Sequence, residues 1–383
     1  MPANLLENHV NDIQSQDFEQ TPLYALHRER GARMAPVAGY EMPVQYQGII
    51  VEHLHTRENA ALFDVSHMGQ VILRGEDVAA ALETLVPGDF QELPVGKTRY
   101  TVLTNDRGGI IDDLMVTHGG DHLFVVLTAS RKEKDLAHFE AHIGGRCKIE
   151  VLSDRALLAL QGPAAVNVLA RLAPPCRHMF FMTGEALSVA DVPCFVIRSG
   201  YTGEDGFEIS VPAEEAEHLA RLLLDEPEVR PAGLGARDSL RLEAGFCLYG
   251  NDIDETTTPV EAGLSWVIGK RRRAEGGFPG AAVIARQLAE GVERKRVGLR
   301  AEGKIPARAH APITEPDGAE GGLVIGEVTS GGYGPTVGGP VAMGYVKAER
   351  ARSDTPVSLM VRGKALAARV AKLPFVEHRY FKR

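Results

Sequence analysis

Two adjacent acids in an apolar strand are the side chains of this sequence most suited to moving protons. Asp112 and Asp113 lie in the segment GGIIDDLMV, which follows the turn-forming residues NDRG. Side chains alternate along a strand, so the two carboxyls point to opposite faces and at least one lies among apolar neighbours. Burial raises the pKa of a carboxyl group and makes it a candidate for acid-base work on a ligand. A bend or bulge that brings both acids to water is the alternative.

The register of this hairpin predicts a partner for one of the acids. If residues 105–108 form a four-residue turn, Thr104 pairs with Gly109, and Tyr100 then lies opposite Asp113. A phenol would face a carboxylate across the ladder.

A second hairpin and a later helix supply further polar groups. In SGYTGEDGFEIS, alternation leaves Glu208 on the face opposite to the apolar residues, and three glycines surround Tyr201. Glycines permit close approach of a ligand, although glycine-rich turns are also common without one. The helix that begins RDSLRLEAG carries Arg237, whose guanidinium suits a carboxylate or a planar heterocycle. A solvated helix face is the alternative for this arginine.

The segment that follows this helix has simpler interpretations. Thr258 to Glu261 reads as a capping box that starts a helix, and the single tryptophan, Trp266, closes that helix as core or as a stacking platform. The basic run at 270–273 is interpreted as a solvated turn, with docking of an acidic partner as the alternative.

The composition limits the classes of function. The chain has 383 residues, of which 44% are hydrophobic and 24% charged, which suits two or three globular domains. A formal net charge of -9 argues against nucleic-acid binding. The four cysteines form no CxxC pair, and no P-loop, GxGxxG, GxSxG or HExxH motif occurs, so no metal site is expected. No signal, arginine-rich transit or membrane-spanning segment is recognised, which predicts a cytoplasmic protein that does not bind membranes.

The elements that must position these side chains predict an α+β fold. Thr21 and Pro22 are expected to cap and open a helix that runs to about Arg30. Strands and helices then interleave in two similar units, consistent with duplicated ferredoxin-like or split α+β folds, and helices are expected at 131–142 and 213–224. From Val297 onward, short glycine-rich alternating strands predict a β-barrel or sandwich.

Several of these segments together resemble one protein family. The segments are DVSHMGQ at 64–70, GGIIDDLMV at 108–116, SGYTGEDGFEIS at 199–210, RDSLRLEAGFCLYGNDID at 237–254, TPVEAGLSWVIGKRR at 258–272 and VAMGYV at 341–346. In type and order they are similar to the aminomethyltransferases, the T-proteins of the glycine cleavage system.

The resemblance implies a fold and a reaction. The fold would be a three-domain cloverleaf that binds tetrahydrofolate. Its parts would be a flexible segment at 1–20, a discontinuous α+β domain at 21–55 plus 153–275, an α+β domain at 56–152 and a C-terminal β-barrel at 285–383. The reaction would take the aminomethyl group from the dihydrolipoyl arm of lipoylated H-protein and yield ammonia and 5,10-methylenetetrahydrofolate, without a metal.

The resemblance also assigns residues. Asp113 would be the catalytic aspartate near nitrogen 10 of the folate. The folate-binding residues would be Tyr100, Tyr201, Glu208, Arg237 and Tyr380. The alternatives are another folate-dependent one-carbon transferase or demethylase of the same superfamily, and a non-catalytic folate-binding relative. The latter carries a KGCYxGQE motif where this chain has FCLYGND at 246–252.

Overall fold

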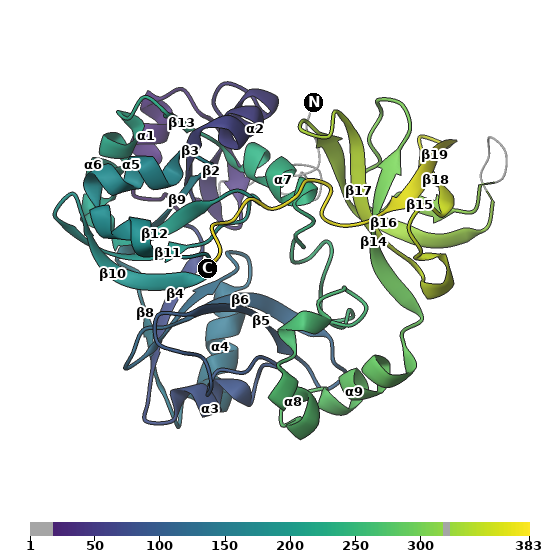
Figure 1. Cartoon of the computed structure of the whole chain (residues 1–383), viewed down its shortest axis with the longest axis horizontal. Helices are drawn as coiled ribbons and strands as arrows, with labels where there is room; N and C mark the ends of the chain where they lie inside the picture. Colours follow the sequence, from purple (N-terminus) through teal and green to yellow (C-terminus); the bar gives the residue numbers. More distant parts are fainter. Residues whose placement is uncertain (1–17, 317–321) are drawn as a thin grey trace. The chain divides into compact units, whose positions relative to one another are not determined.

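A computed structural model of the chain describes residues 18–316 and 322–383. They group into two compact units, and Figure 1 labels their helices and strands. Unit 1 comprises the described part of Met1–Met68 with Ser153–Leu240 and His378–Arg383, and unit 2 comprises Gly69–Leu152 with Arg241–Glu377. The predicted flexible segment at 1–20 lies outside the described residues except for its last three, and the predicted division into three domains stays a prediction.

Unit 1 is built on a mixed sheet whose strand order is β10-β11-β12-β9-β3-β13. The strands of this sheet are β3 (Ala60–Asp64), β9 (Arg155–Gln161), β10 (Thr183–Val189), β11 (Val192–Arg198), β12 (Gly206–Pro212) and β13 (Val229–Pro231), and β1 (Arg33–Val37) and β2 (Tyr40–Gln45) form a separate two-stranded sheet. Its helices are α1 (Tyr24–Glu29), α2 (Ile49–Glu58), α5 (Ala165–Leu172), η1 (Pro174–His178), α6 (Ala213–Leu224) and the larger part of α7 (Leu234–Glu243).

The core of unit 1 forms because the alternating apolar side chains of β12 meet amphipathic helices. Phe207, Ile209 and Val211 are fully buried and pack with the apolar faces of α5 and α6. This leaves Glu208 and Ser210 on the other face of the strand. Helix α6 has the predicted bounds.

Unit 2 contains a five-stranded antiparallel sheet, in the order β5-β6-β7-β4-β8, and a closed barrel, in the order β14-β17-β16-β15-β18-β19. The strands of the sheet are β4 (Gly69–Arg74), β5 (Thr98–Thr104), β6 (Ile110–His118), β7 (Leu123–Leu127) and β8 (Lys148–Val151). Those of the barrel are β14 (Arg294–Ala301), β15 (Pro312–Thr314), β16 (Val324–Gly334), β17 (Gly339–Lys347), β18 (Pro356–Val361) and β19 (Lys364–Ala371). The helices are α3 (Val78–Glu83), α4 (Lys132–Ile143), η2 (Ser265–Val267), α8 (Lys270–Glu275), α9 (Ala281–Glu290) and η3 (Ala348–Arg350).

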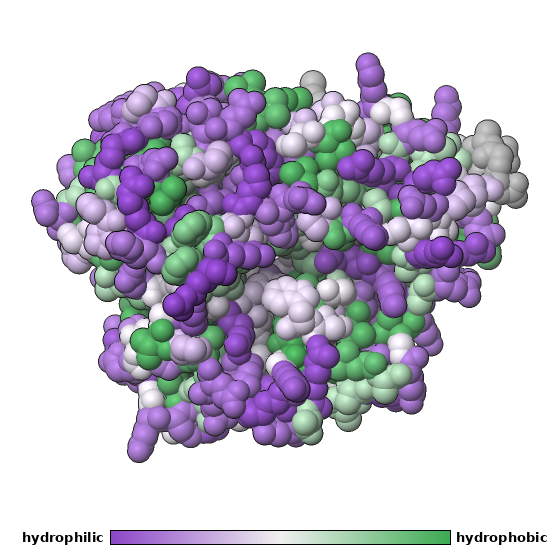
Figure 2. All heavy atoms as spheres, viewed as in Figure 1, coloured by the Kyte–Doolittle hydropathy of each residue, from purple (hydrophilic) through white to green (hydrophobic). Residues whose placement is uncertain are grey.

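The α+β class and the C-terminal barrel are therefore confirmed, and the barrel takes the place of the alternative sandwich. Leu82 of α3 and Phe139 of α4 are buried with the apolar face of the five-stranded sheet. Polar side chains cover most of the face shown in Figure 2, with hydrophobic ones scattered among them. Among the described residues, no helix has the length and apolar character needed to cross a membrane.

Two local predictions at helix starts are wrong. The hydroxyl of Thr21 does not cap α1 but donates to the buried Asp64 carboxylate at 2.6 Å, and α1 begins at Tyr24. The capping box exists, since the Thr258 amide donates to Glu261 at 2.8 Å and the Glu261 amide to the Thr258 hydroxyl at 3.2 Å. It closes an isolated turn, because the chain does not continue as a helix there.

Candidate functional site

The hairpin of β5 and β6 has a different register from the predicted one. Tyr100 pairs with Met115, and Val102 lies opposite Asp113, because the turn is longer by one residue and a bulge between Leu103 and Thr104 adds another. The pairing of Tyr100 with Asp113 is therefore wrong.

The side chains of Tyr100 and Asp113 nevertheless lie close together. A shift of two residues preserves the faces of a strand, so the phenol and the carboxyl become diagonal neighbours on one face. A hydrogen bond from Tyr100 to Asp113 lowers the pKa of the acid, but burial and then the charge of Asp112 dominate and raise this pKa to about 7. Asp113 is partly exposed and can therefore exchange a proton near neutral pH.

Asp112 occupies the opposite, fully buried face, as the alternation predicts. One carboxylate oxygen accepts a hydrogen bond from the Thr128 amide at 3.2 Å, and the carboxyl group is hydrogen-bonded to that of Asp135 on α4. Burial raises the pKa of both groups, and the proximity of Asp135 raises that of Asp112 further. Two carboxyl groups buried in contact hold a proton between them, since two bare charges at this distance repel strongly.

The Trp266 ring packs against the ring of Tyr100. The two ring centroids lie 5.5 Å apart with an interplanar angle of 30°. The indole is 63% exposed, so it is a stacking platform and not a core residue.

The loop between α7 and the turn at 258–261 packs against the hairpin of β5 and β6. The Ile110 amide donates to the Asp254 carbonyl at 3.0 Å, and the Asn105 side chain donates to the Glu255 carbonyl at 3.0 Å. A Cβ at Gly109 would lie 1.9 Å from the same Glu255 oxygen, so only glycine allows the loop to approach this closely.

The acids of this loop have structural partners. Asp252 accepts from Arg241 at 2.8 Å and from Ser330 of the barrel at 2.8 Å. Glu255 pairs with Arg131 at 3.1 Å and with Lys134. They hold the loop in place, and their charges are already compensated.

The predicted site residues Tyr201, Glu208 and Arg237 of unit 1 lie near one another, on β12, on the loop before it and on α7. Glu208 is 6% exposed and accepts a hydrogen bond from the Ser199 hydroxyl at 2.8 Å. The Arg237 guanidinium lies 5.0 Å from the centroid of the Tyr201 ring. Burial lowers the pKa of Arg237, and the negative charge of Glu208 opposes this effect. Within the described residues, Arg237 Nη1 has no hydrogen-bond partner, so this buried donor is open to a ligand.

The start of α7 is fixed by close packing. Glu52 of α2 accepts from the Gly233 amide at 2.8 Å, and a Cβ at Gly235 would lie 2.6 Å from Ile49. The glycines that precede Arg237 thus let the helix start against α2, and this sets the direction of the arginine.

Tyr380 lies on the C-terminal tail of unit 1. Its ring stacks on Phe181 with centroids 3.8 Å apart, and burial raises the pKa of its hydroxyl. That hydroxyl is buried and has no partner in the described part of the chain. The structure thus brings together Tyr100 with Asp113 in unit 2, and Tyr201, Glu208 and Arg237 in unit 1.

The basic run at 270–273 is helix α8, and its interpretation as a solvated turn is wrong. Arg271 pairs with Glu83 at 2.6 Å and with Asp89 at 3.0 Å, and the buried Arg272 donates to the Glu83 carbonyl at 2.6 Å. Two of its four charges therefore stabilise the fold, which weakens the case for a docking surface.

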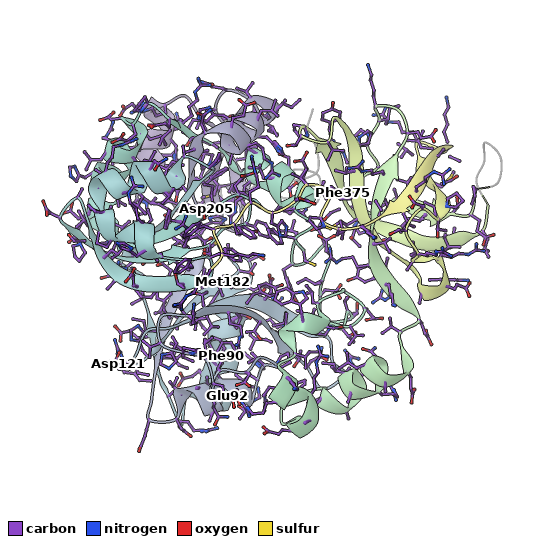
Figure 3. The ribbon with its side chains drawn as sticks, in the orientation of Figure 1. Phe90, Glu92, Asp121, Met182, Asp205 and Phe375 are labelled. Carbon is purple, nitrogen blue, oxygen red and sulfur yellow. The ribbon has the colours of Figure 1, made fainter. Side chains whose placement is uncertain are left out.

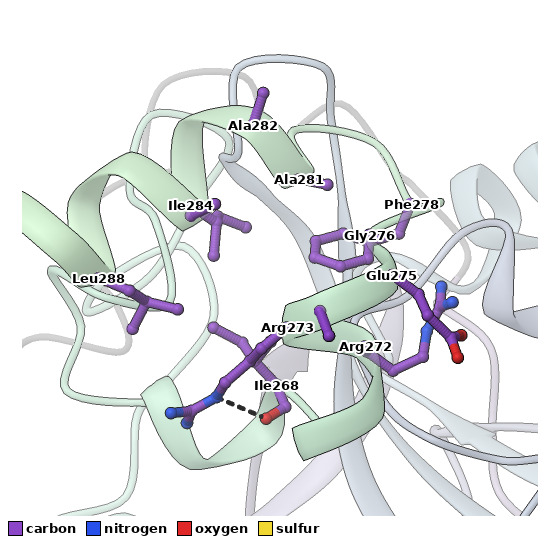
Figure 4. Close-up of a pocket in the computed structure, with 12 residues that line it drawn as sticks. Ile268, Arg272, Arg273, Glu275, Gly276, Phe278, Ala281, Ala282, Ile284 and Leu288 are labelled. Carbon is purple, nitrogen blue, oxygen red and sulfur yellow. Dashed lines mark hydrogen bonds between the residues drawn. The ribbon is translucent and has the colours of Figure 1, made fainter.

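An apolar cavity of about 200 Å³ lies between α8 and α9 (Figure 4). Phe278, Ile284 and Leu288 line it, and Arg273 at its edge donates to the Ile268 carbonyl at 3.1 Å. None of its lining residues is a predicted site residue, and we assign it no part in the chemistry.

Comparison with known proteins identifies the family. Residues 23–272 match the family model of the GCVT N-terminal domain, and residues 294–377 match that of the glycine cleavage T-protein C-terminal barrel domain. The chain therefore belongs to the glycine cleavage T-protein family.

Individual relatives narrow the assignment to an activity. A mitochondrial aminomethyltransferase of Gallus gallus is 50% identical over 389 residues, covering 99% of this chain and 97% of the relative. That of Solanum tuberosum is 48% identical over 377 residues, covering 96% and 92%. The crystal structure of glycine cleavage system aminomethyltransferase T from Bartonella henselae matches with a TM-score of 0.90 and 44% identity, over 95% of this chain and 100% of that chain. The activity of the chain is thus aminomethyl transfer in glycine cleavage.

The prediction of a cytoplasmic protein is contradicted. The relatives from Gallus gallus, Solanum tuberosum and Dictyostelium discoideum are all named as mitochondrial enzymes. The prediction was wrong because it used the lack of a recognisable targeting segment as evidence for a compartment.

Proposed function

We propose that the chain transfers the aminomethyl group from the dihydrolipoyl arm of H-protein to tetrahydrofolate. Tetrahydrofolate, as the second substrate, supplies two nitrogens that accept the one-carbon unit. The products are 5,10-methylenetetrahydrofolate, ammonia and dihydrolipoyl H-protein. The two hydrogens lost from the folate nitrogens end on ammonia and on the released sulfur, so no oxidant or reductant is needed.

The observation that carries the folate assignment is the buried pair of opposite charges in unit 1. Glu208 can accept hydrogen bonds from the amino-substituted edge of a pterin, and the open Nη1 of Arg237 can donate to an acceptor of the same ligand. The ring of Tyr201 beside Arg237 adds a flat surface suited to a planar heterocycle.

We assign the proton chemistry to Asp113. A carboxyl group with a pKa of about 7 is present in both protonation states at neutral pH, which suits general acid-base catalysis. Tyr100 orients this carboxyl through its hydrogen bond. Asp113 would orient nitrogen 10 of the folate and stabilise positive charge that develops there.

The experiment that tests this assignment compares matched carboxyl variants. We expect Asp113→Asn to lower tetrahydrofolate-dependent ammonia release from aminomethylated H-protein by about 100-fold or more. The control is Asp121→Asn, because the Asp121 side chain is 77% exposed in a surface pair with Arg74 (Figure 3). Turnover of Asp113→Asn near that of the wild type would contradict the catalytic assignment.

Binding is tested separately from turnover. We expect Glu208→Gln to weaken tetrahydrofolate binding at least tenfold in a titration, since a desolvated charged acceptor is lost. Glu217→Gln is the matched control, because Glu217 is a surface residue of α6 paired with Arg221. Equal folate affinity in Glu208→Gln and the wild type would remove Glu208 from the site.

A further inference from the structure

We infer that Glu204, held between Arg57 and Arg379, is a positioning residue that fixes both the Tyr201 loop and the Tyr380 tail for folate binding. This inference rests on the proposed function, because it concerns how two of the proposed folate-binding residues are held. Glu204, Arg57 and Arg379 all belong to unit 1.

The centre of the arrangement is a buried carboxylate shared by two guanidinium groups. The Glu204 side chain is 0% exposed. Its Oε1 accepts from Arg57 Nη1 at 2.8 Å, and from Arg379 Nη2 at 2.6 Å and Nε at 3.1 Å. The Arg379 side chain is 51% exposed, so the cluster joins a buried residue to the molecular surface.

Arg57 ties this carboxylate to the Tyr201 loop. Its Nη1 also donates to the Thr202 carbonyl at 2.7 Å, directly after Tyr201 in the chain. The Thr202 hydroxyl donates in turn to Gln161 at 2.7 Å, and the Glu204 amide donates to the Thr202 hydroxyl at 3.2 Å. The loop is therefore fixed by both its backbone and its side chains on the face where Tyr201 meets Arg237.

Arg379 ties the same carboxylate to the tail. Its amide donates to the Gly203 carbonyl at 2.8 Å, and its Nη2 donates to the Arg57 carbonyl at 2.5 Å. The tail thus lies along the Tyr201 loop, with a parallel bridge between Arg379 and Glu204. Tyr380 follows Arg379 directly, so the position of one sets that of the other.

A second contact holds the tail beyond Tyr380. The Phe381 ring stacks on Phe180 with centroids 5.3 Å apart, and the Arg198 guanidinium lies 4.5 Å from its centroid. Arg198 is itself paired with Asp205, the residue after Glu204. The consecutive acids Glu204 and Asp205 thus each fix one side of Tyr380.

The cluster is poorly explained by stability alone. Burying charged groups costs solvation free energy that their attraction often fails to recover, and apolar residues would hold a tail at lower cost. Within the described residues, Glu204 Oε2 has no hydrogen-bond partner. The ion pairs instead fix the orientation of the loop and the tail, because planar guanidinium groups with two donors set direction as well as distance.

The test uses variants at both ends of the cluster. We expect Arg379→Met and Glu204→Gln each to weaken tetrahydrofolate binding about tenfold or more and to raise the KM for tetrahydrofolate similarly. We expect kcat at saturating folate, and the KM for aminomethylated H-protein, to stay within about threefold of the wild type. Arg379→Lys should recover part of the affinity, because one charged donor to Glu204 remains. The matched controls are Arg171→Met and Glu217→Gln, which remove exposed ion pairs of unit 1.

The outcomes separate this inference from a structural role and from the proposed function. Arg379 is half exposed, so Arg379→Met keeps the test available if Glu204→Gln does not fold. Unchanged folate affinity in folded Arg379→Met would overturn the inference, and so would an equal loss for both substrates. If the wild-type protein did not bind tetrahydrofolate, the proposed function would fall and the inference with it.

Discussion

Replacing Tyr100 by phenylalanine should move the acid limb of the pH-rate profile upward. The phenol donates a hydrogen bond to the Asp113 carboxylate, and this bond opposes the burial and the Asp112 charge that raise the pKa to about 7. Phenylalanine keeps the ring that faces Trp266 and removes only the donor. Without this donor the ionised form of Asp113 is less stable, so the pKa of Asp113 rises and activity below the new pKa falls.

The size of this shift follows from the environment of the acid. A hydrogen bond to a charged group contributes roughly 1.5–3 kcal/mol, and the partial exposure of Asp113 places it at the lower end. One pH unit corresponds to about 1.4 kcal/mol, so we expect the limb to move up by about one unit. At pH 6 the variant should then be roughly tenfold slower than the wild type, and above pH 9 the two should converge.

The assay is kcat/KM for tetrahydrofolate in ammonia release, from pH 5.5 to 9.5, because its pH dependence reports groups of the free enzyme. The profiles are scaled to their values at pH 9.5, which separates the protonation of Asp113 from any loss of folate affinity. Tyr333→Phe is the control, because Tyr333 is an exposed residue of the barrel. An acid limb that stays in place, or moves to lower pH, would refute the role given to the Tyr100 hydrogen bond.

Three further variants test separate parts of the account. Arg237→Lys should weaken tetrahydrofolate binding tenfold or more in a titration, because an ammonium group lacks the planar fork; unchanged binding would exclude the arginine from the site. Asp112→Asn should be more stable than the wild type towards urea at pH 8, by about 1–2 kcal/mol, and equal to it near pH 3. The pKa of Asp112 is raised in the folded state, so its carboxyl group contributes stability below the ordinary pKa of 3.8, and this contribution is lost as the pH rises through the folded-state pKa. Parallel curves of stability against pH for the two proteins would contradict this explanation. Asp135→Asn should likewise remove part of this pH dependence, because the shared proton needs both carboxyl groups, and the same urea series would show it.

The elements of the fold could be predicted because their patterns are local. The strand β12 and the helix α6 follow from alternation in FEISV and from the amphipathic run after it, and both pack as expected. The register of β5 and β6 could not be predicted, because it depends on where Asn105 and Gly109 meet the loop at 254–257. That contact joins residues about 150 positions apart in the sequence.

The partners of charged side chains were the least predictable feature. The ion-pair partners of Arg241, Glu204 and the run at 270–273 lie 11, 147 and more than 180 positions away in the sequence, so no local pattern reveals them. The Asp112–Asp135 pair was also missed, since nothing in the helical pattern of α4 marks Asp135 as buried. The acids of GYTGED were a usable signal: two adjacent carboxylates in a tight loop require compensating cations, and the structure supplies Arg57, Arg379 and Arg198.

A crystal structure with bound tetrahydrofolate tests the central claim most directly. We expect the pterin of the bound tetrahydrofolate to lie within hydrogen-bond distance of Glu208 and Arg237. A bound tetrahydrofolate whose pterin contacted neither Glu208 nor Arg237 would contradict this claim.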